Sequence, residues 1–300
     1  MPNRSSLKSA LPLVIVLTLV WGTTWVLFPY AVREVSVWTF RAVAVTFAGL
    51  SLLAVAGLRG LPLSIPRASW PTLVGAALVY LVIWNIASTF AAVLIPSGQA
   101  ALLGFTMPLW VTLVAWAVWG ERPSPRLGLA VALGGVGVGL LMARGADAYA
   151  RAPLGFALGL LAALGWAIGT LMLKRRPIAA PALVHTGWQL LVASVPITAA
   201  ALYFGDGMLF MPSWPSIAVI TYIALMPMAL GNVVWFSIVR VLPVNVAALS
   251  SVMVPVVAMI VGAVVHQEPL GLTQGVAMLC CAAGLLLALT KPGQTVKTAV

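Results

Sequence analysis

The chain contains two related stretches, PSGQAALLGFTMPLWVTLVAWAVWGE at residues 96–121 and PVNVAALSSVMVPVVAMIVGAVVHQE at residues 243–268. A shift of 147 positions aligns them without a gap, and both carry a proline near the middle and an acidic residue at the end. Self-similarity at a fixed spacing indicates an internal repeat. The identical pairs that this shift produces include Asn85 with Asn232, Pro96 with Pro243, Pro108 with Pro255, Glu121 with Glu268 and Gly137 with Gly284.

The composition around these stretches is that of an integral membrane protein. Hydrophobic residues make up 62% of the 300 residues and charged residues only 7%, too few polar groups to cover a water-soluble globule. The apolar runs are about 20 residues long, enough for a helix to cross ~30 Å of hydrocarbon, whereas barrel strands alternate over about ten residues. Breaks at charged, proline and glycine clusters predict ten helical spans, near residues 11–32, 36–57, 70–92, 97–118, 125–143, 153–174, 181–203, 214–238, 244–265 and 270–290.

Each copy of the repeat holds five spans. The stretches VWGTTW and GWAIGT in the first and sixth spans place Trp21 against Trp166. Because five is odd, the second copy must enter the membrane from the opposite side. We therefore predict an all-α integral membrane protein of ten transmembrane helices, built as two inverted five-helix repeats (5+5) at residues 1–147 and 148–300 within a single transmembrane domain. This architecture recurs in secondary transporters, whose substrate site lies near the bilayer midplane.

The net charge of +11 is explained by membrane orientation. Lys and Arg gather in alternate loops rather than on one compact face, so we expect a lipid bilayer and a small-molecule substrate as partners, and no nucleic acid. Both termini should face the cytoplasm of a multi-pass protein in the cell (inner) membrane. No feature of the sequence sets the oligomeric state. The opposite loops hold only Arg33, Arg144 and Arg151, against Arg4, Lys8, Arg59, Arg67, Arg122, Arg126, Lys174, Arg175, Arg176, Arg240, Lys291 and Lys297 on the N-terminal side.

Several motifs carry a family resemblance that covers essentially the whole chain. They are WGTTW in the first span, IPSGQAALLGFTMPLWVTL in the fourth, GERPSPRLGLAVALGGVGVGLLM in the fifth, and the second copy that begins LPVNVAALSSVMVPVV. Together they resemble the drug/metabolite transporter superfamily, and within it the EamA-type ten-helix members. The tryptophan-rich character is most similar to the YddG-type exporters of aromatic and other amino acids. The resemblance implies export of small metabolites through a central cavity by alternating access.

The predicted membrane core contains no Asp, Glu or Lys in the middle third of any span. Buried carboxylates mark proton and ion pathways, so the usual carboxylate relay is missing, and facilitated movement and proton exchange both stay open as driving forces. A phosphorylated substrate would need Arg or Lys in the cavity, which this core is expected to lack. We expect a net-neutral substrate, foremost an amino acid with an aromatic or large apolar side chain, and neither a cofactor nor a metal.

Polar and aromatic side chains deep in the spans are the candidate substrate-binding residues. Midplane tryptophans can stack on an apolar substrate or attract an ammonium group, and buried amides must hydrogen-bond to a ligand or across helices. The alternative for each tryptophan is packing between helices, and for each amide a structural hydrogen bond. The candidates are Trp21, Thr24, Tyr80, Trp84, Asn85, Trp110, Trp166, Gln189 and Asn232.

Two further polar residues are candidate gates. Arg41 lies about a turn and a half into the second span from the outer surface. Its side chain either snorkels to the lipid headgroups, or it is a gate or a partner for a substrate carboxylate on the outward side. His185 lies one turn before Gln189 on the seventh span. It either senses pH or gates substrate, or it makes a hydrogen-bonded contact between helices.

The repeated prolines predict bent helices. A proline inside a membrane helix removes a backbone donor, which neighbouring groups can compensate only where the helix is buried or lines a cavity. We expect Pro108 and Pro255 to bend the fourth and ninth spans near the centre, where they serve either as hinges or as static bends. Glu121 and Glu268, on opposite membrane sides, should cap helices or form ion pairs.

Other classes of function fit less well. The sequence has no GxSxG or HExxH motif and no paired aspartates, so we expect no enzyme. A channel-like or facilitative pore for small uncharged solutes is the main alternative to a carrier, since some channels also have inverted repeats. An exporter of other metabolites or of drugs is the second alternative.

Overall fold

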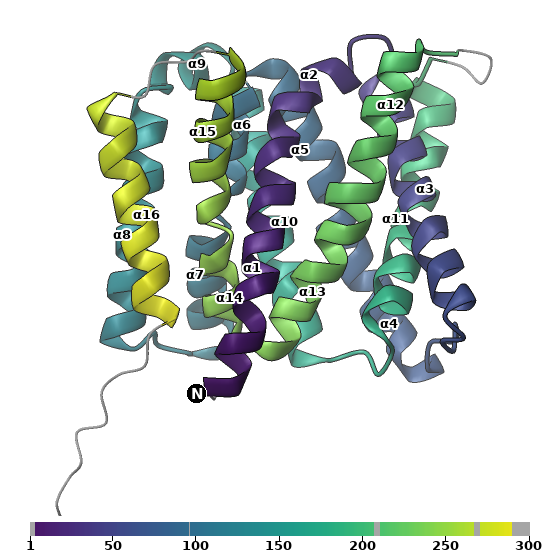
Figure 1. Cartoon of the computed structure of the whole chain (residues 1–300), viewed down its shortest axis with the longest axis horizontal. Helices are drawn as coiled ribbons and strands as arrows, with labels where there is room; N and C mark the ends of the chain where they lie inside the picture. The colour runs from purple at the N-terminus through teal and green to yellow at the C-terminus, as the bar shows by residue number, and fades with distance from the viewer. Residues whose placement is uncertain (1–3, 96, 207–210, 267–270, 290–300) are drawn as a thin grey trace, which may run out of the picture.

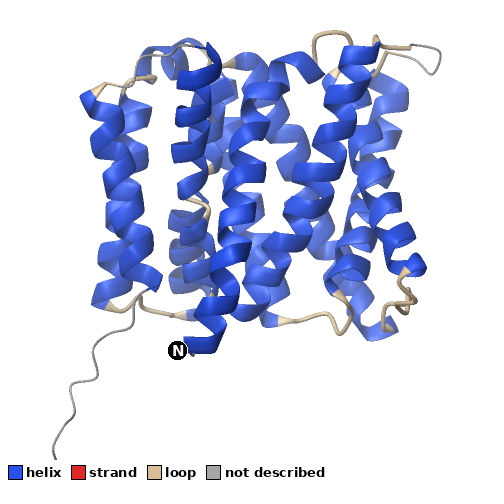
Figure 2. Ribbon diagram, in the orientation of Figure 1, coloured by secondary structure: helices blue, strands red, loops and turns tan. Residues whose placement is uncertain are grey.

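The computed structural model describes residues 4–95, 97–206, 211–266 and 271–289 as a bundle of roughly parallel helices (Figures 1 and 2). Within those ranges there is no strand. Among the described residues, seven helices are long and apolar enough to cross a membrane, and three shorter apolar helices accompany them. The predicted fold class is therefore confirmed. Pro96 and Glu268 lie outside the described residues. The same holds for residues 267–270, where the predicted loop between the ninth and tenth spans ends.

The spans of the first repeat are assembled from several helical pieces. The N-terminus of α1 and the C-terminal end of α16 lie at one face of the bundle (Figure 1), which we call the N-terminal face. The pieces are α1 (Arg4–Thr24), η1 (Trp25–Leu27), α2 (Phe28–Ala31), α3 (Val37–Leu58), η2 (Arg67–Ser69), α4 (Trp70–Ala76), η3 (Ala77–Val82), α5 (Ile83–Leu94), α6 (Ser97–Gly104), α7 (Met107–Trp119) and α8 (Pro125–Ala143).

The second repeat follows a short connecting helix, α9 (Ala146–Arg151), in which the predicted boundary at residues 147 and 148 falls. That boundary stays a prediction. The remaining helices are α10 (Pro153–Arg175), α11 (Ala182–Phe204), α12 (Trp214–Ile223), η4 (Ala224–Leu230), α13 (Gly231–Val241), α14 (Val244–Ser250), α15 (Met253–His266) and α16 (Leu272–Leu289).

The helices pack in pairs that respect the repeat. Helix α3 packs on α11, the second span of each repeat, and α8 packs on α16, the fifth span of each. Helix α1 contacts α13 and α15, while α10 contacts α5 and α7. Exchanging the two repeats turns each of these contacts into another one that is present. The bundle is thus a pseudo-twofold assembly. In it, the first span of each repeat packs against the third and fourth spans of the other repeat.

Glycines allow the closest of these contacts. A Cβ atom built on Gly165 of α10 would lie 2.6 Å from the carbonyl oxygen of Val79, and one built on Gly284 of α16 would lie 2.7 Å from that of Ala130. Both distances are shorter than real Cβ contacts. Small residues let membrane helices approach this way, where dispersion contacts replace the hydrophobic driving force.

The fourth and ninth spans are interrupted at equivalent places. Helix α6 ends at Gly104 and α7 begins at Met107, with Pro108 in its first turn, where the missing N–H costs no hydrogen bond. Helix α14 ends at Ser250 and α15 begins at Met253. Helix α14 contacts α7, and α15 contacts α6. The two broken spans therefore lie against each other, while their role as hinges remains a prediction.

The third and eighth spans share a feature that the sequence does not predict. In both, a stretch of π-helix interrupts the α-helix, at η3 and at η4. The shift of 147 places Ala77 of η3 on Ala224 of η4, so the two π-helical stretches are repeat equivalents. An i→i+5 backbone pattern turns side chains away from the register of a regular helix, and such stretches are frequent at functional sites.

Two carboxylates form hydrogen bonds between the repeats at the face opposite the N-terminal face. Glu34 accepts hydrogen bonds from the backbone N–H and the hydroxyl of Ser213, both at 2.7 Å, at the N-terminus of α12. Asp206 accepts one from the backbone N–H of Ser36, at 2.6 Å, at the N-terminus of α3. Each acid comes from one repeat and caps a helix of the other.

At the N-terminal face, Glu121 pairs with Arg175. The guanidinium of Arg175 also lies 3.8 Å from the centre of the Trp119 ring. The expectation that Glu121 forms an ion pair at a helix end is confirmed.

A candidate substrate-binding cavity

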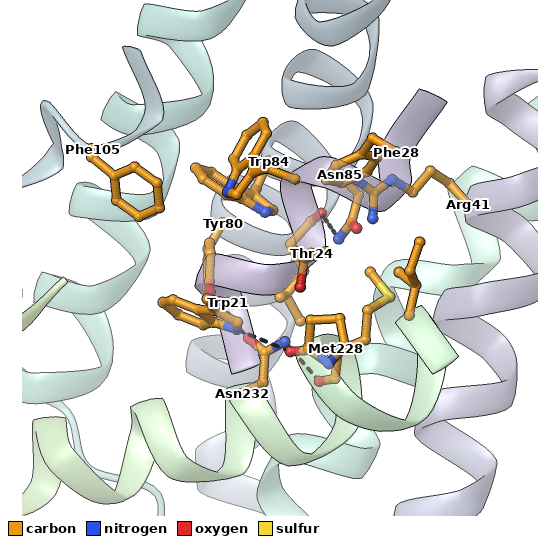
Figure 3. A pocket seen from close by; sticks show the side chains of 14 residues that line it. Trp21, Thr24, Phe28, Arg41, Tyr80, Trp84, Asn85, Phe105, Met228 and Asn232 are labelled. Carbon is orange, nitrogen blue, oxygen red and sulfur yellow. Dashed lines mark hydrogen bonds between the residues drawn. The ribbon is translucent and has the colours of Figure 1, made fainter. Parts of the chain in front are cut away.

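A cavity lies in the middle of the bundle, where the first, third and eighth spans meet (Figure 3). The space inside it for a bound molecule is about 50 Å³. Small-molecule sites typically hold ~300–1,000 Å³, so the cavity is narrow in this conformation. Its lining residues are Trp21, Thr24, Trp25, Phe28, Arg41, Tyr80, Leu81, Trp84, Asn85, Phe105, Ile223, Pro227, Met228 and Asn232.

The first span presents one face to the cavity. Trp21, Thr24, Trp25 and Phe28 follow one another at spacings of one to three and fall on one side of a helix with 3.6 residues per turn. The indole N–H of Trp21 donates to the carbonyl oxygen of Pro227 at 3.0 Å. That carbonyl belongs to the π-helical stretch η4. The first span of one repeat is thereby bonded to the eighth span, in the other repeat.

The two asparagines occupy equivalent places beside the π-helical stretches. The amide nitrogen of Asn85 donates to the carbonyl oxygen of Leu81 at 2.6 Å, and that of Asn232 donates to the carbonyl oxygen of Met228 at 2.8 Å. The amide oxygen of Asn232 also accepts from the Tyr80 hydroxyl at 3.0 Å. The amide oxygen of Asn85 is buried and has no hydrogen-bond partner in the part of the chain that the structure describes.

Arg41 lies at the edge of this cavity, and its side chain is 2% exposed. Its Nε donates to the hydroxyl of Thr89 at 2.6 Å, and the guanidinium lies 4.7 Å and 4.8 Å from the ring centres of Phe28 and Phe40. The snorkelling interpretation is therefore wrong, because the face of α3 that carries Arg41 turns toward the protein. The cavity thus contains Arg41, the one basic residue that is the exception to the charge-free core that the sequence predicts.

A cluster of packed aromatic rings, the aromatic layer, lies beside the cavity. Trp166 and Trp235 are fully buried, and their ring centres lie 5.1 Å apart. Trp21 packs on both, at 5.2 Å and 5.8 Å, and Trp84 packs on Trp166 at 4.9 Å. Trp235 is three residues nearer the N-terminal face than Asn232, roughly 4.5 Å at 1.5 Å per residue. Along the eighth span, Trp235 therefore lies between the cavity residue Asn232 and that face.

The structure brings most of the predicted substrate-binding residues together. Six of the nine, together with the candidate gate Arg41, line the cavity, namely Trp21, Thr24, Tyr80, Trp84, Asn85 and Asn232.

The other candidates lie elsewhere. Trp166 is behind the cavity wall, and Trp110 donates to the Thr106 hydroxyl at 3.2 Å on its own helix. Gln189 is fully buried between helices, and its amide group has no hydrogen-bond partner within the described chain. His185 packs its ring 5.0 Å from that of Phe236 and lines a separate pocket near the N-terminal face. Its Nε2 lacks a hydrogen-bond partner among the described residues, so the structure does not show the expected hydrogen bond at that atom.

Sequence reasoning missed part of the lining. Trp25 and Phe28 could have been found from the helical spacing that starts at Trp21. Pro227 could have been found from the repeat, since the shift of 147 places it on Tyr80. Phe105 points into the cavity from the break between α6 and α7, which no periodic pattern reveals.

Known proteins share this architecture. A model of the EamA-like transporter family matches residues 8–143 and, a second time, residues 153–290. The chain belongs to the EamA-like transporter family. It is therefore a membrane transporter, and the family resemblance of its motifs is confirmed. A solved crystal structure of a protein matches with a TM-score of 0.77 over 94% of this chain and 96% of that chain, at 19% identity, and so supports the fold alone.

Several relatives of this EamA-like protein are named as transporters. The chain is 23% identical to the uncharacterized transporter YvbV of Bacillus subtilis, over 92% of this chain and 90% of that protein. It is 26% identical to the uncharacterized inner membrane transporter YedA of Escherichia coli K12, over 87% and 84%. It is also 26% identical to the protein PecM of Dickeya dadantii, over 66% of each chain. These names give a class of protein and no substrate.

Proposed function

We propose that this EamA-like transporter exports amino acids, foremost those with aromatic or large apolar side chains, by alternating access. The observation that supports this most is the cavity between the repeats, because it combines indole rings with a few polar groups. Trp21, Trp25 and Trp84 offer apolar surface and ring faces that can attract an ammonium group. Asn85 and Arg41 offer hydrogen-bonding groups at the same cavity. A zwitterion with an apolar side chain needs both kinds of surface.

The packing supports a carrier more than a channel. The rings of Trp21, Trp166 and Trp235 pack on one another beside the cavity, which leaves only about 50 Å³ for a bound molecule. A conducting pore would need a continuous path there, whereas a carrier opens one side at a time. In our proposal the termini are cytoplasmic and the protein lies in the inner membrane, as the distribution of Lys and Arg predicts. Substrate then enters through the aromatic layer and leaves at the opposite face.

The narrow cavity also fits transport by alternating access. A molecule of the size of phenylalanine needs more room than the space now open to water, so the two repeats must separate slightly when substrate binds. Helix breaks beside Pro108 and Pro255 are places where the backbone can take up that change.

Efflux from preloaded cells tests the substrate class. Cells that express the protein are loaded with a panel of amino acids, sugars, nucleosides and quaternary amines, and the loss of each compound is measured against cells without it. We expect faster loss of phenylalanine, tryptophan and leucine, and no change for sugars or nucleosides. Faster loss of sugars, nucleosides or quaternary amines with no effect on amino acids would contradict the proposal.

A further inference from the structure

We infer that Arg41 and Asn85 form a head-group site that binds the carboxylate and the ammonium group of an α-amino acid. In this site the Nη2 of Arg41 donates to the carboxylate, and the amide oxygen of Asn85 accepts from the ammonium group. The inference rests on the proposed function and assigns the orientation of the substrate within it. Two buried polar atoms support it, because neither has a hydrogen-bond partner among the described residues.

The first of these atoms belongs to Arg41. Its guanidinium is buried, yet Nη2 has no hydrogen-bond partner among the described residues, and no Asp or Glu is among the residues that line the cavity. Its Nε donates to the Thr89 hydroxyl. The rings of Phe28 and Phe40 attract the cation but provide no counter-charge. A buried charge without a partner is costly, and a carboxylate from a ligand would supply both the charge and the hydrogen bond.

The second atom is the amide oxygen of Asn85, and the broken symmetry of the repeat explains why it is free. Asn85 and Asn232 are equivalent, and each donates its amide nitrogen to a carbonyl oxygen one turn earlier. That bond fixes which end of each amide is the oxygen, because a carbonyl can only accept.

The partner residue is what differs between the two repeats. Tyr80 donates its hydroxyl to the oxygen of Asn232. The repeat equivalent of Tyr80 is Pro227, which has no hydroxyl. The oxygen of Asn85 is therefore left as an acceptor for a ligand, and an ammonium group carries three donors.

The two residues lie on the same side of the cavity. Figure 3 shows Arg41 and Asn85 together near Phe28, while Trp21 and Phe105 lie on the other side. They are also linked through Thr89, whose hydroxyl accepts from Arg41 Nε and donates to the backbone carbonyl of Asn85, both at 2.6 Å. A donor for a carboxylate and an acceptor for an ammonium group thus lie side by side, as the two groups do on one α-carbon. The substrate side chain then extends toward the indoles.

Analogues that lack one of the two groups test this with the wild-type protein. In proteoliposomes, uptake of labelled phenylalanine is measured against rising concentrations of phenethylamine, 3-phenylpropionate, phenylalaninamide and unlabelled phenylalanine. We expect each analogue to compete at least roughly tenfold more weakly than phenylalanine, since each loses a hydrogen bond to a charged group. If phenethylamine or phenylalaninamide competed as well as phenylalanine, the carboxylate site would be refuted. If 3-phenylpropionate did so, the ammonium site would be refuted.

Two variants separate the two halves of the site. Arg41→Met should weaken the binding of phenylalanine and 3-phenylpropionate by roughly tenfold or more and leave the binding of phenethylamine unchanged. Asn85→Ala should weaken the binding of phenylalanine and phenethylamine and leave the binding of 3-phenylpropionate unchanged. The analogue that each variant still binds shows that the protein is folded. Arg33→Met, at an arginine that lies outside the cavity against Tyr30, is the matched control.

The outcomes distinguish this inference from the proposed function. Phenylalanine transport that Arg41→Met and Asn85→Ala leave intact would refute the head-group site alone. A wild-type protein that transports no amino acid would refute the proposed function and the site together.

Discussion

At the scale of single residues, the cavity is built by differences between two otherwise equivalent repeats. Pro227 is the repeat equivalent of Tyr80, and Gly231 is the repeat equivalent of Trp84. Tyr80 donates a hydrogen bond to the amide oxygen of Asn232, whereas the amide oxygen of Asn85 has no donor among the described residues. Gly231 leaves room for the indole of Trp21, which a Cβ atom at that position would meet. A symmetric cavity would have two identical ends, and these substitutions give it a polar end and an aromatic end.

The hydrogen bond between Tyr80 and Asn232 should stabilise the fold. Tyr80→Phe leaves the amide oxygen of Asn232 buried without a donor, which costs about 1–3 kcal/mol of the free energy of unfolding. We expect a lower thermal midpoint for the variant in detergent micelles. Tyr203→Phe, at an exposed tyrosine, is the matched control and should melt like the wild type. Equal midpoints for all three proteins would show that this bond carries no net stability.

The position of Trp21 should depend on Gly231. In Gly231→Ala the new methyl group collides with the indole, so Trp21 must leave its place above Trp166 and Trp235. We expect a several-fold rise in the KM for phenylalanine efflux, and Trp21→Ala should give a similar rise. The control is Gly139→Ala, where a Cβ atom meets nothing within 4 Å. A KM that stays at the wild-type value in both Gly231→Ala and Trp21→Ala would argue against an aromatic substrate surface.

At the scale of helices, two devices recur in both repeats. The π-helical stretches η3 and η4 place the residues that line the cavity, and the breaks at 105–106 and 251–252 divide the spans that carry the prolines. Both are departures from a regular α-helix at a place where the backbone lies within protein, the condition under which membrane proteins tolerate them.

Pro108 tests whether the breaks are hinges. In Pro108→Ala the proline ring no longer clashes with the preceding turn, so α6 and α7 can join into a more continuous helix. If the break is a hinge, the turnover rate of transport should fall while substrate affinity stays near the wild-type value. Pro153→Ala, at the start of α10 where a proline is readily replaced, is the control. Unchanged kinetics in Pro108→Ala would instead support a static bend.

The cross-capping carboxylates should hold the face opposite the N-terminus closed. Hydrogen bonds from the backbone and the hydroxyl of Ser213 lower the pKa of Glu34. For Asp206, burial raises the pKa, but the hydrogen bonds from Ser36 and Thr39 outweigh it and leave the pKa lowered. Because both pKa values are lowered in this state, its stabilisation is fully present above the ordinary value of about 4. It is lost only as the pH falls through the lowered values.

Glu34→Gln should therefore loosen this face at neutral pH. A cysteine at Thr24, in a background without Cys280 and Cys281, reports access to the cavity through its rate of reaction with a water-soluble thiol reagent. We expect a faster reaction in the Glu34→Gln variant than in its parent between pH 6 and 8, with a ratio that falls toward one below about pH 4. The ratio cancels the titration of the thiol itself. A ratio of one at neutral pH would show that Glu34 does not hold the face closed.

At the scale of the whole molecule, the sequence predicts the architecture because the repeat keeps a constant spacing of 147 residues over its third to fifth spans. The shift of 147 that aligns Pro108 with Pro255 also predicts which helices are equivalent, and the observed pairs of α3 with α11 and α8 with α16 follow it. Apolar spans of the right length leave few other choices in a bilayer, since every backbone group must be bonded within the helix.

The sequence predicts the site less completely. Residue counting places Arg41 near the headgroups, but it cannot show that α3 turns this residue inward against Phe28. Counting also places Trp166 at the right depth, without showing that Trp21 and Trp84 cover it. The π-helical stretches have no periodic pattern of their own, so the rotation that they impose on Tyr80 and Met228 appears only in the structure.

The central claim is that one cavity between two repeats is exposed alternately to the two faces of the membrane. Counterflow tests it most directly. Proteoliposomes are preloaded with unlabelled phenylalanine at high concentration, and the uptake of dilute labelled phenylalanine is compared with that of vesicles without preload. Alternating access predicts faster, saturable and transient accumulation of label in the preloaded vesicles. Equal rates with and without preload, in protein that does transport phenylalanine, would contradict the account and indicate a channel-like pore.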